Sequence, residues 1–239
     1  MRLRMLAASL LAALSLNGVA GAEETAKAPK APKWEQFDQE DGIRMFRRDV
    51  PGSSIVALRG EGFIEAPITK VASVLADRKR SPEWIDRLVK TKVLRELSDT
   101  EAINWNHIKT PTPLKDRDFV FKTVITTNAA KKQVVFSYYS VKDPLAPEYD
   151  AYVRGDFQSG KFELTMGERT NKDGTKTRGT IVVAEVIVDP RGSVPTFLVN
   201  MVQKSWPHKT LTALRRQVQK PDIKDDPRVV ERLTREGFI

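Results

Sequence analysis

Three polar residues of this chain could act on a substrate or hold an anion: His107, Tyr138 and Arg154. The chain has two histidines and no cysteine, so it lacks the residues for a common zinc site or a cysteine nucleophile. His107 alternates with Ile103 and Trp105 in a segment of strand periodicity. We therefore expect it either to offer a polar contact to a ligand or to be hydrogen-bonded within the fold.

Arg154 lies among apolar neighbours in another segment of strand periodicity. A buried arginine is rare unless it is paired. Either Arg154 lies on the outer face of a sheet, or it meets a carboxylate or the polar head of a ligand. The nearby residues 116–118, Asp-Arg-Asp, are interpreted as a salt-bridge and turn cluster at the start of a strand.

The chain is also rich in aromatic residues, some of which would form core and some the wall of a cavity. At about 0.8 kcal/mol per buried CH₂, a chain of about sixteen methylenes contributes roughly 13 kcal/mol before ordering costs. Such a cavity needs no catalytic group, metal or cofactor, and we expect none. The predicted ligand-binding residues are Trp84, Trp105, His107, Phe121, Tyr138, Arg154, Phe197 and Met201.

A long C-terminal helix is the element expected to close this cavity. Ser193 is a good N-cap, and apolar residues recur from Val194 to Val218 at spacings of three, four and seven, so one face is buried. Pro207 lies inside this pattern and removes one backbone hydrogen bond. It should bend the helix or split it near residues 203–206.

Period-two hydrophobicity predicts the sheet that the helix would cover. Two strands, 43–49 and 54–64, come first. Two short helices follow, at 67–76 and after Ser81-Pro82-Glu83. The remaining strands are predicted at 93–97, 102–109, 119–127, 134–141, 151–157, 161–168 and 176–188. Short separators between them favour an antiparallel sheet, which would curve around the long helix and hide its apolar face.

The two ends of the chain have other compositions. Residues 1–22 have the charged start, apolar run and small-residue site of a cleaved signal peptide, so we expect a periplasmic protein. Residues 23–33 are rich in Ala, Pro and Lys and are interpreted as a flexible linker before a domain at 34–219. Residues 220–239 are interpreted as a tail with a short helix.

The formal charge is +9, and removal of Arg2 and Arg4 with the signal leaves +7. This excess would be a solvated basic surface or a patch that contacts anionic lipid head groups. Basic residues are interspersed with acidic ones, so nucleic acid is not an expected partner. We expect a monomer.

Four stretches in order resemble the START lipid-transfer domains, which belong to the helix-grip superfamily with the Bet v 1 allergens and polyketide cyclases. They are Ser81–Leu94, Lys115–Val120, Tyr152–Gly160 and Val188–Asn200. The resemblance implies an α+β helix-grip fold and the transfer of one lipid or sterol-like apolar molecule, with transient membrane contact. Thr123 stands where some sterol-transfer members have a buried base, so sterol specificity is not implied.

Two alternatives to a lipid carrier remain open. One is a cyclase or aromatase that uses the cavity, with His107, Tyr138 and Arg154 as its acid, base or anion-holding set. The other is an envelope interaction module that transfers nothing.

Overall fold

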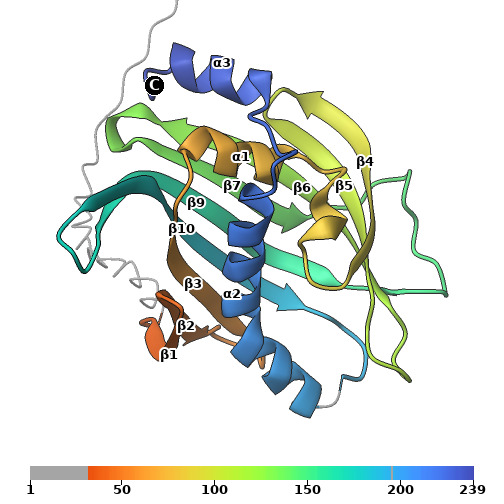
Figure 1. The fold of residues 1–239 in the computed structure, drawn as a ribbon. Helices are drawn as coiled ribbons and strands as arrows, with labels where there is room; N and C mark the ends of the chain where they lie inside the picture. The colour runs from red at the N-terminus through yellow and green to blue at the C-terminus, as the bar shows by residue number, and fades with distance from the viewer. Residues whose placement is uncertain (1–31, 195) are drawn as a thin grey trace, which may run out of the picture. The chain divides into compact units, whose positions relative to one another are not determined.

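A computed structural model of the chain describes residues 32–239 except Pro195, and the side chains of 195–203 are also outside its described part. The predicted signal peptide and most of the predicted linker therefore lie outside the described residues. The described residues form a curved sheet with α1 and α2 on one face of it (Figure 1). This arrangement confirms the predicted α+β helix-grip fold.

The sheet has ten strands and runs β1-β2-β3-β10-β9-β7-β6-β5-β4, with β8 paired to β6. All pairs are antiparallel except β6 with β8. The strands are β1 (Glu35–Glu40), β2 (Ile43–Asp49), β3 (Val56–Ile64), β4 (Leu88–Ser98), β5 (Glu101–Ile108), β6 (Arg117–Asn128), β7 (Gln133–Ser140), β8 (Val153–Arg154), β9 (Asp156–Thr170) and β10 (Lys176–Asp189).

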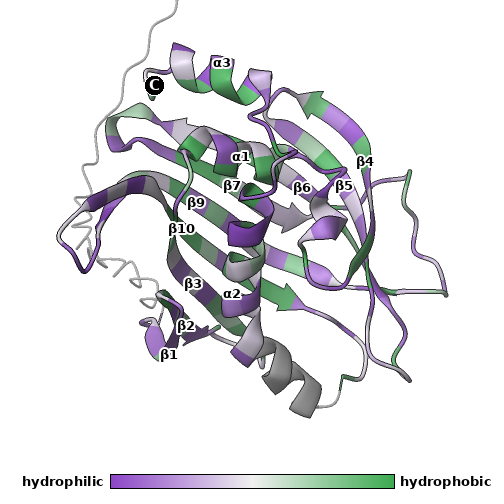
Figure 2. Cartoon of the chain, viewed as in Figure 1, coloured by the Kyte–Doolittle hydropathy of each residue, from purple (hydrophilic) through white to green (hydrophobic). Residues whose placement is uncertain are grey.

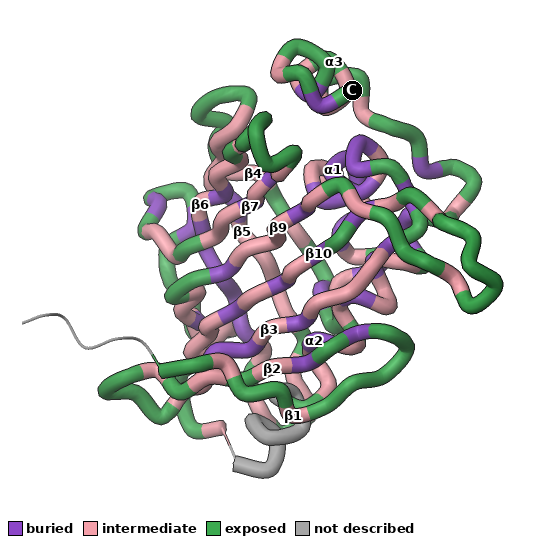
Figure 3. Tube along the Cα trace, turned by 90° about the vertical axis from the view of Figure 1, so that its left-hand side faces the viewer, coloured by how far each residue is buried: buried purple, intermediate pink, exposed green. Residues whose placement is uncertain are grey.

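The helices are α1 (Ile68–Ala76), α2 (Thr196–Val218) and α3 (Pro227–Arg235), with 3₁₀ turns η1 (Ser81–Glu83) and η2 (Ala129–Lys131). Buried and less buried positions alternate along β10, as the strand period requires (Figure 3). Apolar residues lie on the strands behind α1 and α2 (Figure 2). Among the described residues, no helix combines the length and apolarity needed to span a membrane.

Helix α2 approaches β3 closely because β3 has glycine where the two elements meet. A Cβ on Gly60 would lie 3.0 Å from Cβ of Pro207 and 3.3 Å from its carbonyl oxygen. Leu211 and Leu214, on the same helix, are fully buried. The helix continues through Pro207 without interruption, so the predicted split near residues 203–206 does not occur.

Three elements differ from the sequence prediction. Strand β1 was missed because it is a polar edge strand with mostly exposed side chains. The predicted second helix is only the single turn η1, after which the chain enters β4 at Leu88. The predicted turn at 158–160 is wrong, because β9 continues through it with only a shift of register against β10, opposite Ile187 and Val188.

Gly160 explains the error at this predicted turn. Its φ is not positive, and a Cβ there would lie 2.3 Å from the ring of Phe157. The glycine therefore makes room for an aromatic ring that packs across the strand. In sequence, Gln-Ser-Gly reads as a turn because glycine is more often used for its conformational freedom.

The C-terminal tail packs on the outer side of α1. Ile223, Leu233 and Phe238 are buried in the main core cluster. Ser73 of α1 accepts a hydrogen bond from the Asp226 backbone at 2.7 Å, and Thr69 donates to Asp225. Residues 220–239 are thus part of the same compact unit as the sheet.

Candidate functional site

A cavity of about 390 Å³ lies between the sheet and α2. Every layer of the fold contributes to its wall: β3, the α1–β4 connection, strands β5, β6, β7, β9 and β10, and the described half of α2. Its apolar lining includes Leu58, Leu75, Trp84, Phe119, Phe121, Phe157, Phe162, Val186, Val188 and Trp206. The volume lies near the lower end of the roughly 300–1,000 Å³ typical of small-molecule pockets.

Aromatic rings form a continuous row along this wall. Phe119 contacts Phe157 edge to face at a centroid distance of 6.0 Å, and Phe157 lies 5.9 Å from Phe121. The row continues through Tyr138, which lies 6.0 Å from Phe121 and 6.2 Å from Phe162. Three of these four contacts are edge to face, an arrangement that aromatic pairs favour, so the rings form one packed apolar wall.

Of the predicted ligand-binding residues, Trp84, Phe121 and Tyr138 line the cavity. The side chains of Phe197 and Met201 lie outside the described residues. The structure therefore brings three of the predicted side chains together on one wall, and their contact with a ligand stays a prediction.

Trp105, His107 and Arg154 do not line the cavity, which corrects the prediction that they share it with Tyr138. On β6 the odd-numbered residues Phe119 and Phe121 face the cavity. His107 pairs instead with Asp118, and Trp105 with Val120. Paired residues share a face of an antiparallel sheet, so His107 and Trp105 point to the opposite face.

Asp118 is the centre of this outer cluster, and its side chain is 2% exposed. It accepts hydrogen bonds from Nε and Nη2 of Arg154 at 2.9 and 2.8 Å and from the Trp105 indole at 2.9 Å. Arg154 also donates to the carbonyls of Ala146 and Pro147. Arg154 was expected either to lie on the outer face of the sheet or to meet a carboxylate or a ligand. It lies on the outer face and is paired with the carboxylate of Asp118. The pair fixes the 141–152 loop to β6.

His107 is paired with Asp116 at 2.7 Å between Nε2 and Oδ2, and Tyr152 packs on the imidazole at 4.7 Å. Asp116 also accepts from the backbone N–H of Thr110 at 2.9 Å. These hydrogen bonds, that of Thr110 first, lower the pKa of Asp116 from 3.8 to about 2. Of the two roles considered for His107, the hydrogen-bonded one is therefore observed.

The shifted pKa of Asp116 predicts a loss of stability in acid. A carboxyl group whose pKa falls on folding stabilises the protein above its unfolded pKa, and that contribution is lost as pH drops through the folded pKa. We expect Asp116→Asn to lower the free energy of unfolding at pH 6, with the gap to wild type closing between pH 4 and 2. Urea unfolding across this range measures both proteins. Parallel pH profiles would contradict the assignment.

Arg117 was interpreted as part of a salt-bridge and turn cluster, but it has a different role. Its guanidinium is buried and donates to the carbonyls of Lys115, Pro190 and Arg191 at 2.6, 3.2 and 3.0 Å. Burial lowers its pKa. Arg117 therefore ties β6 to the loop that leads into α2, at the end of the cavity lined by Pro190 and Val194.

Two other features are less suited to an apolar ligand. An open depression is lined by polar side chains only: Asp41, Thr212, Arg215, Arg216, Gln219 and Lys220. Possible ligand atoms of Glu40, Asp41 and His208 lie within 4.8 Å of one another, but the acids are exposed. Because His208 bonds to Asp41 at 3.0 Å, this cluster joins α2 to the β1–β2 turn.

The curved sheet, the long helix and the cavity between them define a helix-grip protein with an internal cavity. This chain belongs to the START domain family, whose match covers residues 20–222. An uncharacterised protein of Pseudomonas aeruginosa is 27% identical over 191 residues, which is 80% of this chain and 89% of that protein. The phosphatidylcholine transfer protein of Mus musculus is 25% identical and covers 72% of this chain, with 77% of its own length matched.

Solved structures agree with this assignment. The crystal structure of a STAR-related lipid transfer protein from Xanthomonas axonopodis has a TM-score of 0.64 at 25% identity, covering 78% of this chain and 99% of that chain. Human STARD10 has a TM-score of 0.67 at 20% identity, covering 79% and 74%. The resemblance to START domains noted in the sequence is confirmed.

Proposed function

We propose that this protein binds a single lipid or other apolar molecule in the cavity and carries it between membranes of the cell envelope. The observation that carries the proposal is the cavity with its aromatic row. A ligand that replaces water on such a wall gains free energy in proportion to the apolar area it buries. Binding of this kind needs neither a cofactor nor a reaction.

The relatives support the lipid class of ligand. The mouse relative is named as a phosphatidylcholine transfer protein, and the bacterial solved structure as a lipid transfer protein. At about a quarter of residues identical, they support the class of ligand and leave the individual lipid open. The carrier function thus rests on the family and on the cavity together.

The cyclase alternative required His107, Tyr138 and Arg154 in one cavity. Among the described residues only Tyr138 of this set lines the cavity, while Asp116 and Asp118 engage the other two on the opposite face. No observation favours catalysis over binding. We therefore propose a binding protein and not an enzyme.

Transient contact with a membrane would occur at the basic end of the cavity. Its lining there includes Arg87, Lys109 and Lys209, with Asp86 as the acidic neighbour. These cations would be attracted to anionic head groups, worth about 1 kcal/mol each near a charged surface. We propose a monomer that touches the membrane only during exchange and does not bind nucleic acid.

A vesicle assay tests the carrier function. Donor vesicles carry a self-quenched fluorescent phospholipid, acceptor vesicles carry none, and the protein is added at increasing concentration. A carrier raises the rate of dequenching in proportion to its concentration, and the rate increases with anionic lipid in the acceptors. Lipid binding without any increase in transfer rate would favour an interaction module that retains its lipid.

We also propose export to the periplasm with cleavage after Ala22. The mature chain is then expected to begin at Glu23 and to have a formal charge of +7. Intact-mass measurement of the protein from a periplasmic extract checks this directly. A mass that includes residues 1–22 in that fraction would contradict cleavage, and recovery only from the cytoplasm would contradict export.

A further inference from the structure

The tail at residues 220–239 packs on α1, although residues 223–239 of it lie outside the START match. It follows α2 and places α3 beside α1 (Figure 1). Ile223, Leu233 and Phe238 are its apolar anchors, and all three are buried in the main core cluster. Burial of apolar side chains stabilises the contact between the tail and the elements beneath it.

Helix α1 is buried on two sides. Seven of its nine residues are buried. Val71 and Leu75 belong to the main core cluster, whereas Thr69 and Ser73, one turn apart on another side, are polar and yet only 6% and 4% exposed. A helix this short gains most of its stability from packing and little from its own hydrogen bonds. The position of α1 therefore depends on what covers its polar side as well as on the sheet.

Hydrogen bonds join that polar side to the tail. Thr69 donates to the carboxylate of Asp225. The Ser73 hydroxyl accepts from the backbone N–H of Asp226 at 2.7 Å and donates to the carbonyl of Thr69 at 2.7 Å. Asp226 also caps α3, since its side chain accepts from the N–H of Arg228 at 2.9 Å. The start of α3 and the polar side of α1 thus hold each other in place.

The last residues of the tail fold back because of Gly237. This glycine follows α3 with φ of +72°, in the left-handed region that glycine favours. The N–H of Phe238 bonds to the carbonyl of Leu233 at 2.8 Å and that of Gly237 to the carbonyl of Thr234 at 3.0 Å, a pattern that ends helices. Phe238 is thereby returned to the core. Lys132, before β7, donates to the Gly237 carbonyl and lies 5.7 Å from the centre of the Phe238 ring.

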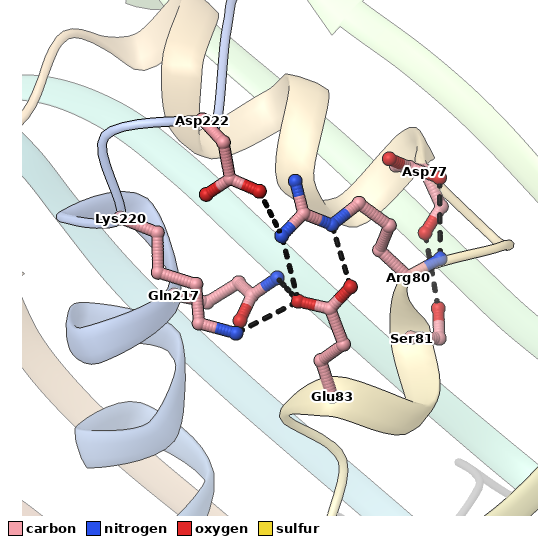
Figure 4. Close-up of polar contacts among 7 residues, drawn as sticks. All are labelled: Asp77, Arg80, Ser81, Glu83, Gln217, Lys220 and Asp222. Carbon is pink, nitrogen blue, oxygen red and sulfur yellow. Dashed lines mark hydrogen bonds and ion pairs between the residues drawn. The ribbon is translucent and has the colours of Figure 1, made fainter.

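The start of the tail is held by charged side chains (Figure 4). Glu83, on the α1–β4 connection, accepts from Lys220 at 2.7 Å, from Arg80 at 2.6 Å and from Gln217 of α2 at 3.0 Å. Arg80 also pairs with Asp222 at 2.8 Å. The tail is therefore attached at three places: to the connection at its start, to α1 in its middle and to the β6–β7 turn at its end.

The elements that the tail holds form one side of the cavity wall. Leu75 of α1 lines the cavity, as do Ser81 and Trp84 of the connection. The part of the wall lined by Pro190 and Val194 comes instead from the loop that leads into the start of α2. Movement of α1 away from the sheet would therefore open the cavity on the side of the tail.

We propose that residues 220–239 form a strap that holds α1 and the α1–β4 connection against the sheet, and that this strap limits the rate at which a bound apolar molecule leaves the cavity. Opening of α1 requires the anchors and hydrogen bonds of the strap to break together, so each of them adds to the free energy of opening. The effect on ligand release rests on the proposed lipid-binding function. The effect on α1 itself does not.

Hydrogen–deuterium exchange and probe release test the strap in Phe238→Ala, which removes its last apolar anchor. The amides of α1 should exchange at least about tenfold faster than in wild type, while those of the β9–β10 pair keep the wild-type rate. Release of N-phenyl-1-naphthylamine, measured by stopped flow after mixing with excess phosphatidylcholine vesicles, should accelerate severalfold. Ile239→Ala is the matched control, because Ile239 is the next residue and is exposed. It should match wild type in both measurements.

Thr69→Val keeps the inference testable if Phe238→Ala folds poorly. It removes the hydrogen bond to Asp225 without changing the strap, and should give the same selective effect at smaller size. Wild-type exchange of α1 in the folded variants, or acceleration spread equally over α1 and the sheet, would overturn the strap. Faster exchange of α1 with unchanged probe release would overturn its control of the cavity. If wild type binds no probe, the proposed lipid-binding function fails, and the exchange rates still decide whether the strap holds α1.

Discussion

Replacing Val188 with tryptophan is expected to weaken lipid binding strongly. Val188 lines the cavity at the end of β10, and the larger indole would occupy space that the ligand needs. A cavity of about 390 Å³ leaves little room for both, so we expect affinity to fall by at least about tenfold, or ~1.4 kcal/mol. Titration with a fluorescent fatty acid measures the change.

Ile187→Trp is the control for this substitution. Ile187 is the adjacent residue, does not line the cavity and receives the same new side chain. It should bind the fatty acid as wild type does. Equal binding by the Val188 and Ile187 variants, with both proteins folded by circular dichroism, would show that the ligand lies elsewhere.

Replacing Asp118 with alanine is expected to cost stability of about 3–5 kcal/mol, the usual cost of removing one partner from a buried ion pair. Asp118 and Arg154 are 2% and 13% exposed, and alanine leaves the guanidinium without its carboxylate partner and the Trp105 indole without its acceptor. Urea unfolding measures the loss. A second substitution, Arg154→Met in the same chain, should recover part of it because the uncompensated charge is removed.

Glu168→Ala provides the comparison, because its partner Arg178 is 91% exposed and surface ion pairs contribute roughly 0–1 kcal/mol. If the two alanine substitutions destabilise the protein equally, Asp118 does not hold the 141–152 loop in the way described. Lipid binding should survive Asp118→Ala wherever the protein stays folded, since the pair lies outside the cavity.

Elements in which apolar residues recur with a clear helix or strand period could be predicted from the sequence. The long helix up to Val218, strands β2 and β3 and the turns at 99–100 and 172–174 follow from local patterns that the fold preserves. Strand β1 was not predicted because it is a polar strand at the edge of the sheet and has no apolar alternation. Gly160 misled because sequence does not distinguish a glycine that turns the chain from one that makes room for Phe157.

The site was harder to predict than the fold, because the apolar side chains of a strand do not always face the cavity and the polar ones do not always face away from it. On β5 the apolar Trp105 points away from the cavity, while Asn106 lines it. Trp105 is covered instead by Tyr152 from the 141–152 loop, at 6.1 Å. That cover comes from a distant loop, so strand alternation alone placed Trp105 and His107 on the wrong side.

The cavity-lining residue Arg78 was missed because Arg78-Lys79-Arg80 has the composition of a solvated surface. A signal was nevertheless present. The apolar stripe of α1 runs through Ile68, Val71 and Leu75, and a further step of three reaches Arg78. A charged residue in line with a buried stripe indicates a polar group that faces the interior, which is where the structure places it.

The most direct test of the central claim is native mass spectrometry of the protein purified from its own host under non-denaturing conditions. We expect a one-to-one complex, heavier than the polypeptide by the mass of one lipid, and release of that lipid on organic extraction. The Val188→Trp variant, prepared in parallel, should appear mainly at the mass of the polypeptide. Wild-type protein that carries no lipid, and takes none from a total lipid extract of the host, would contradict the claim that this cavity is a lipid-binding site.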